Sequence, residues 1–140
     1  MHQPYQPLYI NWQERNETGI PLIDEQHRGI VSIVNTFHHM ISQHRDNIAL
    51  YTGISDTLKN YAHIHFMTEE AFMKASHYPN LEQHTEIHRS LTKELERVES
   101  QAIKNNDAQF LLEFLKKWWM DHINEKDQLY AAHLKSHLGN

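Results

Sequence analysis

Residues 54–73 read ISDTLKNYAHIHFMTEEAFM, and this stretch combines an apolar helix face with ionisable residues. Its apolar side chains recur three and four residues apart, which is the spacing of one face of an α-helix. His65 and Glu69 interrupt that face, and because they are four residues apart both side chains reach the same point beside the helix. A buried carboxylate costs roughly several kcal/mol unless a cation or hydrogen bonds compensate it, so Glu69 indicates a partner in the core. The apolar positions are Ile54, Leu58, Tyr61, Phe72 and Met73.

Helical patterns of the same kind account for most of the chain. The sequence contains only four Gly and four Pro, a scarcity that favours helices. The connections are a few residues long, so consecutive helices should be antiparallel neighbours. The chain is therefore expected to be all-α and to form an up-down-up-down antiparallel four-helix bundle. The helices are expected over about residues 21–44, 49–75, 81–105 and 108–136.

Further expectations concern the helix ends and the segment before the first helix. Asn80 and Gln83 have capping-box spacing at the start of the third helix, and Asp107 suits the N-cap of the fourth. Residues 1–19 are too aromatic for a disordered tail, so they are expected to form an extended arm over the core. In the fourth helix the residues expected to face inward are Leu111, Leu115, Trp118 and Leu129.

Composition limits the classes of function. A chain of 140 residues suggests one domain, and a net charge of −5 argues against a nucleic-acid-binding surface. The absence of cysteine excludes disulfides, iron–sulfur clusters and thiolate zinc sites. No apolar stretch is long enough to span a membrane, and residues 1–20 lack a signal-peptide pattern, so a cytoplasmic protein is expected. Thirteen histidines, as many as Lys and Arg together, indicate metal binding or pH sensing.

Histidines also interrupt the apolar faces of the other three helices. His84 and His88 are four residues apart on the third helix, while His27 and His122 occur singly on the first and fourth. Taken alone, His27 or His122 is more typical of a hydrogen-bonded core residue, and the His84–His88 pair is equally typical of a partly exposed surface. Taken together, these readings would require four helices each to bury an unpaired polar group. A shared metal cluster removes that cost.

The donor types indicate more than one metal ion. Nitrogen and oxygen ligands without sulfur suit iron, zinc, copper, nickel or manganese. Five imidazoles and a carboxylate are too many donors for one tetrahedral zinc, but they suit two metals in a helical bundle. A second carboxylate is then expected near His122. Spacing on an ideal helix favours Glu125 over Asp121 and Asp127, because Asp127 lies about 140° round the helix from His122.

In these residues the chain resembles the hemerythrin family, and within it the single-domain bacteriohemerythrins. The resemblance covers nearly the whole chain, so residues 1–140 are expected to form one hemerythrin-like domain, with the arm over 1–19 and the bundle over about 20–136. The matching stretches are Gly19-Ile20-Pro21, Asp24-Glu25-Gln26-His27, His65-Phe66, Glu69-Glu70, Met73, Tyr78-Pro79, His84, His88, Trp118, His122-Ile123 and Asp127.

The resemblance implies reversible O2 binding at a non-haem di-iron centre with an oxo or hydroxo bridge. By the family's pattern one iron is coordinatively full, the other has an open position for O2, and two carboxylates bridge them. This pattern selects Asp127 over Glu125, which requires a local distortion of the fourth helix. The implied ligands are His84, His88 and His122 for the full iron, His27 and His65 for the open one, and Glu69 and Asp127 as bridges.

One position departs from the family. A leucine usually stands three residues before the histidine that corresponds to His122, and this chain has Trp119 there. Trp119 and Ile123 are expected near the O2 pocket, where the indole would narrow the pocket. The alternative is that Trp119 faces outward while Trp118 packs inward.

The resulting function is expected to be an oxygen carrier, store or delivery protein, which binds O2 without turnover. One alternative is an O2 or redox sensor, either part of a longer signalling protein or coupled to one; a protein partner cannot be named from the sequence. Another is a di-iron enzyme acting as a peroxidase, as a ferroxidase or on nitric oxide, against which the low number of carboxylates counts. A mononuclear metal or haem site would leave the His65–Glu69 pair unexplained.

Overall fold

A computed structural model describes residues 9–43 and 48–137, including all their side chains except those of residues 48, 49 and 122–124. A short 3-10 turn, η1 (Glu14–Asn16), is followed by three long helices, α1 (Pro21–Gln43), α2 (Ile48–Ala75) and α3 (Leu81–Asn105). The fourth rod has three parts, namely α4 (Ala108–Lys117), the π-helical segment η2 (Trp118–Asn124) and α5 (Glu125–His137).

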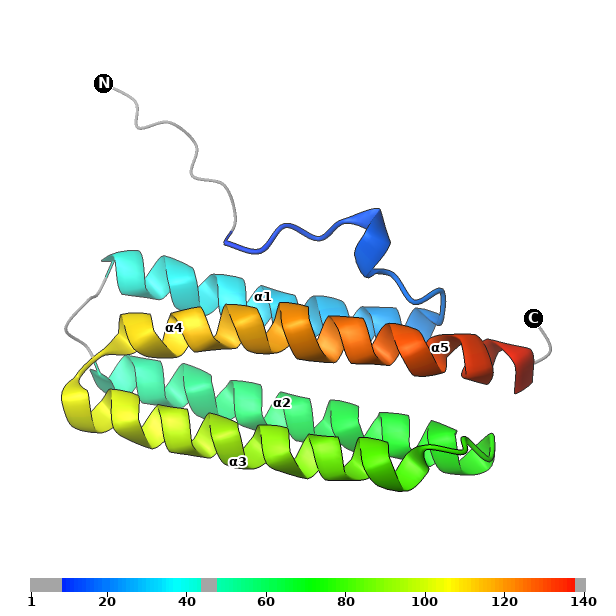
Figure 1. Cartoon of the computed structure of the whole chain (residues 1–140). Helices are drawn as coiled ribbons and strands as arrows, with labels where there is room; N and C mark the ends of the chain where they lie inside the picture. Colours follow the sequence, from blue (N-terminus) through cyan, green and yellow to red (C-terminus); the bar gives the residue numbers. More distant parts are fainter. Residues whose placement is uncertain (1–8, 44–47, 138–140) are drawn as a thin grey trace.

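The four rods run alternately in opposite directions and lie side by side, so the predicted up-down-up-down bundle is confirmed (Figure 1). α1 packs against α2 and α4, and α3 packs against α2 and α4, which closes the ring of neighbours. Residues 9–43 and 48–137 contain no β-strand. The predicted helix boundaries are correct to within one or two residues wherever the structure describes them.

The two predicted caps had different outcomes. Asp107 caps the fourth rod as predicted, because its Oδ1 accepts a hydrogen bond of 3.0 Å from the backbone N–H of Phe110. Asn80 precedes α3, but its side chain makes no capping hydrogen bond, so the predicted capping box there is wrong. The reason is backbone geometry, since Asn80 has φ −104° and ψ 26° instead of the extended conformation that N-cap side chains need.

The core consists of two apolar clusters with buried polar residues between them. On α1, Ile23 belongs to the smaller cluster and Ile30 to the larger, and His27 lies between them in the chain. The same order holds on α2, where Glu69 lies between Phe66 and Met73. The helices therefore bring one polar layer into register across an otherwise apolar bundle.

The π-helical segment changes which side of the fourth rod faces inward. A π turn takes in about one residue more than an α turn, so every later residue is rotated by about 100°. Relative to Leu115, this moves Asp127 from about 120° to about 20° and Leu129 from about 40° to about 140°. Asp127 is accordingly 2% exposed and Leu129 is 66% exposed, so the prediction that Leu129 faces inward is wrong.

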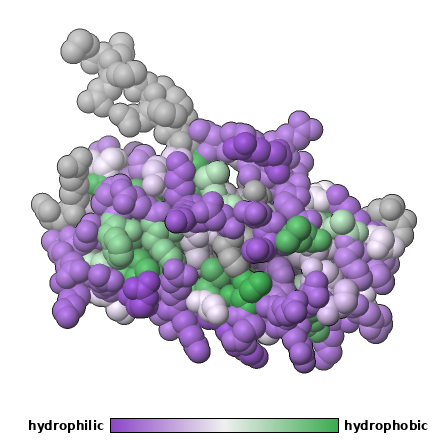
Figure 2. All heavy atoms as spheres, viewed as in Figure 1, coloured by the Kyte–Doolittle hydropathy of each residue, from purple (hydrophilic) through white to green (hydrophobic). Residues whose placement is uncertain are grey.

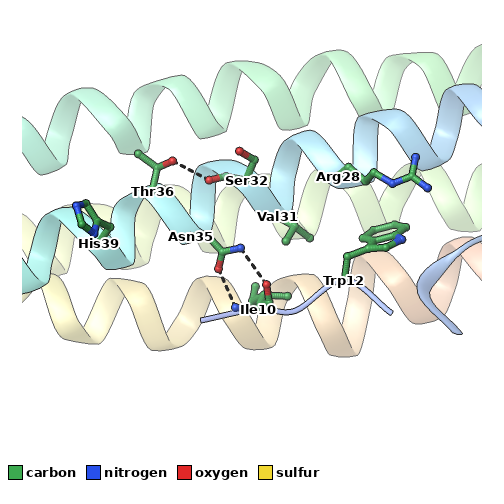
Figure 3. A pocket seen from close by; sticks show the side chains of 8 residues that line it. All are labelled: Ile10, Trp12, Arg28, Val31, Ser32, Asn35, Thr36 and His39. Carbon is green, nitrogen blue, oxygen red and sulfur yellow. Dashed lines mark hydrogen bonds between the residues drawn. The ribbon is translucent and has the colours of Figure 1, made fainter. Parts of the chain in front are cut away.

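The described part of the arm lies over the bundle as predicted, whereas residues 1–8 of the predicted arm lie outside the described residues. The Asn35 amide holds the backbone of Ile10 in both directions, accepting from its N–H at 2.7 Å and donating to its carbonyl at 2.9 Å (Figure 3). At the other end of the arm, the buried Asp24 carboxylate accepts hydrogen bonds from Thr18 and from the backbone N–H of Gly19. These bonds hold the first turn of α1, and Asp24 itself lies about one turn before His27.

Hydrophilic residues cover most of the surface in view, with hydrophobic side chains confined to separate patches (Figure 2). Within the described residues, no helix combines the length and the apolar character needed to cross a membrane.

Candidate metal centre

The structure brings together every predicted ligand whose side chain it describes. These side chains come from α1, α2, α3 and α5, and all are buried, so the polar layer is closed to solvent. The side chain of His122, and that of Ile123 from the predicted O2 pocket, lie outside the described residues. The assembled residues are His27, His65, Glu69, His84, His88 and Asp127.

Two carboxylates stand at the centre of this layer. The Oε1 atom of Glu69 lies 3.3 Å from Nε2 of His65 and 3.2 Å from Nε2 of His88. The Oδ2 atom of Asp127 lies 2.6 Å from Nε2 of His27 and 3.1 Å from Nε2 of His65, while its Oδ1 lies 3.6 Å from Nε2 of His84. Each carboxylate therefore faces histidines from more than one helix.

Hydrogen bonds outside the layer fix the ring of His65. Thr68 donates from its hydroxyl to the Ile64 carbonyl at 2.8 Å, so its oxygen is free to accept from the Gln26 amide nitrogen at 3.3 Å. The Gln26 carbonyl oxygen then faces Nδ1 of His65 at 2.8 Å. Because that oxygen can only accept, Nδ1 carries the hydrogen, and Nε2 presents its lone pair to the carboxylates.

His88 is held in the same way by a different partner. Its Nδ1 lies 2.8 Å from Oε2 of Glu70, and an ionised carboxylate is an acceptor only, so Nδ1 donates. Phe66 stacks on the same ring with the centroids 4.1 Å apart, which fixes the ring plane. Nε2 of His88 therefore also presents a lone pair to the interior.

In this arrangement hydrogen-bond acceptors, the imidazole lone pairs and the carboxylate oxygens, face one another. The Nε2 lone pairs of His65 and His88 point at carboxylate oxygens, and neither oxygen of Glu69 has a hydrogen-bond partner among the described residues. Such facing groups repel one another in a buried site unless a proton or a metal ion lies between them. The donor set of neutral imidazoles and carboxylates is the one that iron and related transition metals bind, so the residues fit metal ions.

The donor atoms fall into two groups, and within each group all lie within 4.8 Å of one another. Glu69 and Asp127 belong to both groups, which is the arrangement of two metal ions bridged by two carboxylates. Glu125 and Asp121, the other carboxylates considered near His122, have exposed side chains. The preference for Glu125 that an ideal helix gives is therefore wrong, and the π-helical segment is the physical reason. One group comprises His27, His65, Glu69 and Asp127; the other comprises Glu69, His84, His88 and Asp127.

Burial and mutual contact shift the pKa values of the central groups in opposite directions. Burial raises the pKa of Glu69 well above its ordinary value, and the negative charge of Asp127 raises it further. Burial also acts to raise the pKa of Asp127, but its close contacts with Glu69 and His27 outweigh burial and hold that pKa well below its ordinary value. In the metal-free protein the pair therefore keeps one proton, on Glu69. Burial lowers the pKa of His65, which keeps its ring in the neutral form that binds metals.

Trp119 faces inward and is fully buried, as is its neighbour Trp118. The Trp119 ring lies edge-on to His27, with centroids 4.9 Å apart, and Trp12 of the arm packs on its other side at 6.1 Å. Arg28 lies over the Trp12 ring at 5.0 Å (Figure 3) and also pairs with Glu17 at 2.8 Å. Two layers of indole therefore separate His27 from solvent.

Three residues of the site have no role predicted from the sequence. Two of them, Gln26 and Glu70, stand in the stretches that resemble the family. Glu70 accepts a hydrogen bond from the outer nitrogen, Nδ1, of His88. The third is Tyr130, whose buried hydroxyl acts to lower the pKa of Glu69 against the larger effect of burial, while burial raises the pKa of Tyr130 itself. The available signal was adjacency, since Gln26 and Glu70 each stand next to a ligand in the chain.

Comparison with known proteins agrees with this geometry. A family model described as the hemerythrin HHE cation binding domain matches residues 18–134. A bacteriohemerythrin of Stenotrophomonas maltophilia (strain R551-3) is 30% identical over 128 residues, which are 91% of this chain and 82% of that protein. A bacteriohemerythrin of Clostridium acetobutylicum is 34% identical over 128 residues, covering 85% and 96% of the two chains. A solved hemerythrin structure, that of a leucine-to-alanine mutant, has the same fold, with a TM-score of 0.78 at 24% identity over 91% of this chain and 98% of that one.

The buried proton on Glu69 predicts how the stability of the metal-free protein depends on pH. Because its pKa is raised in the folded state, the folded protein binds that proton more tightly than the unfolded chain does. The contribution of this proton to the free energy of unfolding should therefore fall as pH rises above the ordinary Glu pKa of about 4.3, by at most about 1.4 kcal/mol per pH unit. His65, whose pKa is lowered, contributes in the opposite direction up to its ordinary pKa of about 6.5. Urea unfolding of chelator-treated wild type and Glu69→Gln, compared at each pH from about 5 to 8, isolates the Glu69 contribution because that of His65 is common to both.

Glu69→Gln should abolish that fall and should also abolish tight metal binding. Glu94→Gln, at an exposed position on α3, is the matched control and should keep the wild-type pH profile. An unchanged pH profile in Glu69→Gln would contradict the assignment of the proton.

Proposed function

Because the chain belongs to the hemerythrin family, we propose that it binds O2 reversibly at a non-haem di-iron centre, as an oxygen carrier, store or delivery protein. The observation that carries this function is the pair of buried donor groups that share Glu69 and Asp127. When bound, two ferrous ions supply the electrons that O2 accepts and later returns. The protein supplies the ligands, excludes water and fixes the proton positions around them.

We assign the ligands by combining the family's pattern with the two donor groups. His84 and His88 would hold one iron together with His122, and His27 and His65 would hold the other, which has fewer protein ligands and would be the one open to O2. Glu69 and Asp127 would supply carboxylate oxygens to both irons. The burial of both carboxylates against histidines from each half supports this assignment.

The proposal is ligand binding without turnover. Five neutral imidazoles and two carboxylates bring little negative charge, and such a set stabilises strongly oxidised metal ions less than a carboxylate-rich set does. The curated relatives are described as bacteriohemerythrins and, in Theromyzon tessulatum, as a myohemerythrin that is 25% identical over 135 residues. We further propose that arm and bundle act as one domain. A cytoplasmic setting is part of the proposal, because a chain without cysteine needs no oxidising compartment.

Trp119 closes the half of the centre that contains His27 and His65. The indole lies against His27, where the family usually has the smaller leucine, and Trp12 covers it from outside. We propose that O2 reaches the open position only when this packing loosens. Slow exchange of O2 and slow autoxidation follow from that arrangement.

The function is tested by iron content and the visible spectrum. Protein reconstituted anaerobically should hold two ferrous ions per chain and should gain a visible absorption band with O2 that disappears when O2 is removed. Asp127→Asn should lose the paired metals, because it removes a bridging oxygen from both donor groups. Glu125→Gln, two residues away and exposed, should retain them.

Two irons that pass directly to a stable ferric product would instead favour a sensor or an oxidase. A single metal per chain would refute the di-iron assignment. Loss of metal in Glu125→Gln with retention in Asp127→Asn would reverse the choice of bridging carboxylate.

Trp119→Leu should speed both O2 dissociation and autoxidation severalfold, because it removes the indole that covers His27. The cavity it leaves should lower the free energy of unfolding by about 2–4 kcal/mol. Stopped-flow measurement of O2 release and thermal unfolding check the two effects. Trp118→Leu is the control, since that side chain is equally buried but packs on Phe66, and it should lower stability without matching the change in release rate.

A further inference from the structure

Two histidines of the polar layer, His65 and His88, have side-chain hydrogen-bond partners outside that layer. These two partners differ chemically. Nδ1 of His65 donates to the neutral amide oxygen of Gln26, and Nδ1 of His88 donates to the carboxylate of Glu70, both at 2.8 Å. The two distances are equal, so the hydrogen bonds differ in the charge of the acceptor and not in their length. The two histidines belong to different halves of the proposed centre.

The acceptor on Nδ1 changes how strongly Nε2 donates. A carboxylate draws the Nδ1 hydrogen toward itself and leaves more electron density on the ring, so Nε2 becomes a stronger ligand. An amide acceptor is uncharged and does this much less. A histidine backed by a carboxylate therefore stabilises the more positive state of its metal better than a histidine backed by an amide does.

From this difference we propose that Gln26 and Glu70 are positioning residues that make the two halves of the metal centre unequal in donor strength. Glu70 strengthens the half that contains His84 and His88, and Gln26 keeps the half that contains His27 and His65 weaker. This inference rests on the proposed function and deepens it. It assigns the stronger donors to the coordinatively full half and the weaker ones to the half that is open to O2.

The surroundings of each partner support the same division. Glu70 is about a third exposed, with a side-chain exposure of 32%, and lines a surface groove of about 440 Å³ that also contains Arg89 and Lys93. Burial raises the pKa of Glu70, and the positive charge of Arg89 offsets part of that rise. Gln26 instead is fixed by Thr68, whose hydroxyl is already committed to a backbone carbonyl. The amide orientation, and with it the neutral acceptor on His65, is thus fixed by the fold.

Near-isosteric exchange tests the proposal in the full-length chain. Glu70→Gln removes the carboxylate from one half, Gln26→Glu adds a carboxylate to the other half, and the double exchange moves the charge between them. All three leave side-chain size and reach almost unchanged. Zinc is the first probe because it has no redox chemistry, and its binding is followed by calorimetry. Glu70→Gln should weaken one of the two zinc sites by about 10–100-fold, and Gln26→Glu should strengthen the other.

Nitrogen NMR of the histidine rings gives a readout independent of metal affinity. In zinc-loaded and in metal-free protein, Glu70→Gln should shift the Nδ1 resonance of His88 and leave that of His65 in place. Gln26→Glu should do the reverse. With iron bound, the midpoint potential of the metal centre should rise in Glu70→Gln and fall in Gln26→Glu. The O2 dissociation rate should likewise increase in Glu70→Gln and decrease in Gln26→Glu.

Glu96→Gln is the matched control. Glu96 is exposed and lines the same groove as Glu70, so it removes the same charge from the same surface without touching a ligand. It should leave zinc affinity, the histidine resonances and the potential at their wild-type values. Equal effects of Glu96→Gln and Glu70→Gln would overturn the proposal, because they would show a general effect of surface charge.

The proposal would also be overturned if Glu70→Gln and Gln26→Glu changed the zinc affinity or the midpoint potential in the same direction. If a variant bound zinc poorly because it failed to fold, the double exchange, which restores the total charge, and the metal-free NMR would still decide between the outcomes. Protein that binds two zinc ions and shows the expected shifts, but does not bind O2 reversibly in its ferrous form, would refute the proposed function and leave the inequality of the two halves standing.

Discussion

Two carboxylates buried in one layer of a helical bundle are the constraint on which this structure depends. Glu69 and Asp127 lie against histidines from three helices, and their donor atoms stay within 4.8 Å of those histidines. A slip of any helix by one turn would move its ligands by about 5.4 Å and break both donor groups. The apolar clusters on either side of the layer hold the helices in that register. Packing therefore provides the geometry, and bound cations offset the cost of the buried charge.

The helices and the histidine layer were predictable from sequence because both depend on local periodicity. The spacing of His65 and Glu69, or of His84 and His88, puts both side chains on one face of any regular helix. Asp127 was not predictable in this way, because its position depends on a π-helical segment, and the spacing of residues in the sequence does not indicate that segment. Only the resemblance to a family selected it. The π-helical segment rotates the residues that follow it, and this rotation also exposes Leu129.

The outer partners and the indole cover depend on how neighbouring helices are rotated against one another, which one helix's sequence does not specify. Gln26 reaches from α1 to His65 on α2, and Glu70 reaches from α2 to His88 on α3. Trp118 and Trp119 are adjacent, so on an ideal helix they point about 100° apart and one of them would be expected to face solvent. Both are buried because the π-helical segment lies in the bundle and the arm brings Trp12 over Trp119.

The centre consequently has a dry side and a wet side, and this division suits a carrier. On the dry side, Trp119 and Trp12 exclude water from His27, and a small apolar molecule such as O2 can cross packed indoles far more easily than an ion can. On the wet side, Glu70 links His88 to a groove lined by charged residues. O2 must enter and leave without water or charged reductants following it, while the charge that develops on the metals needs compensation. Separating these two requirements onto opposite halves of one centre lets a single bundle meet both.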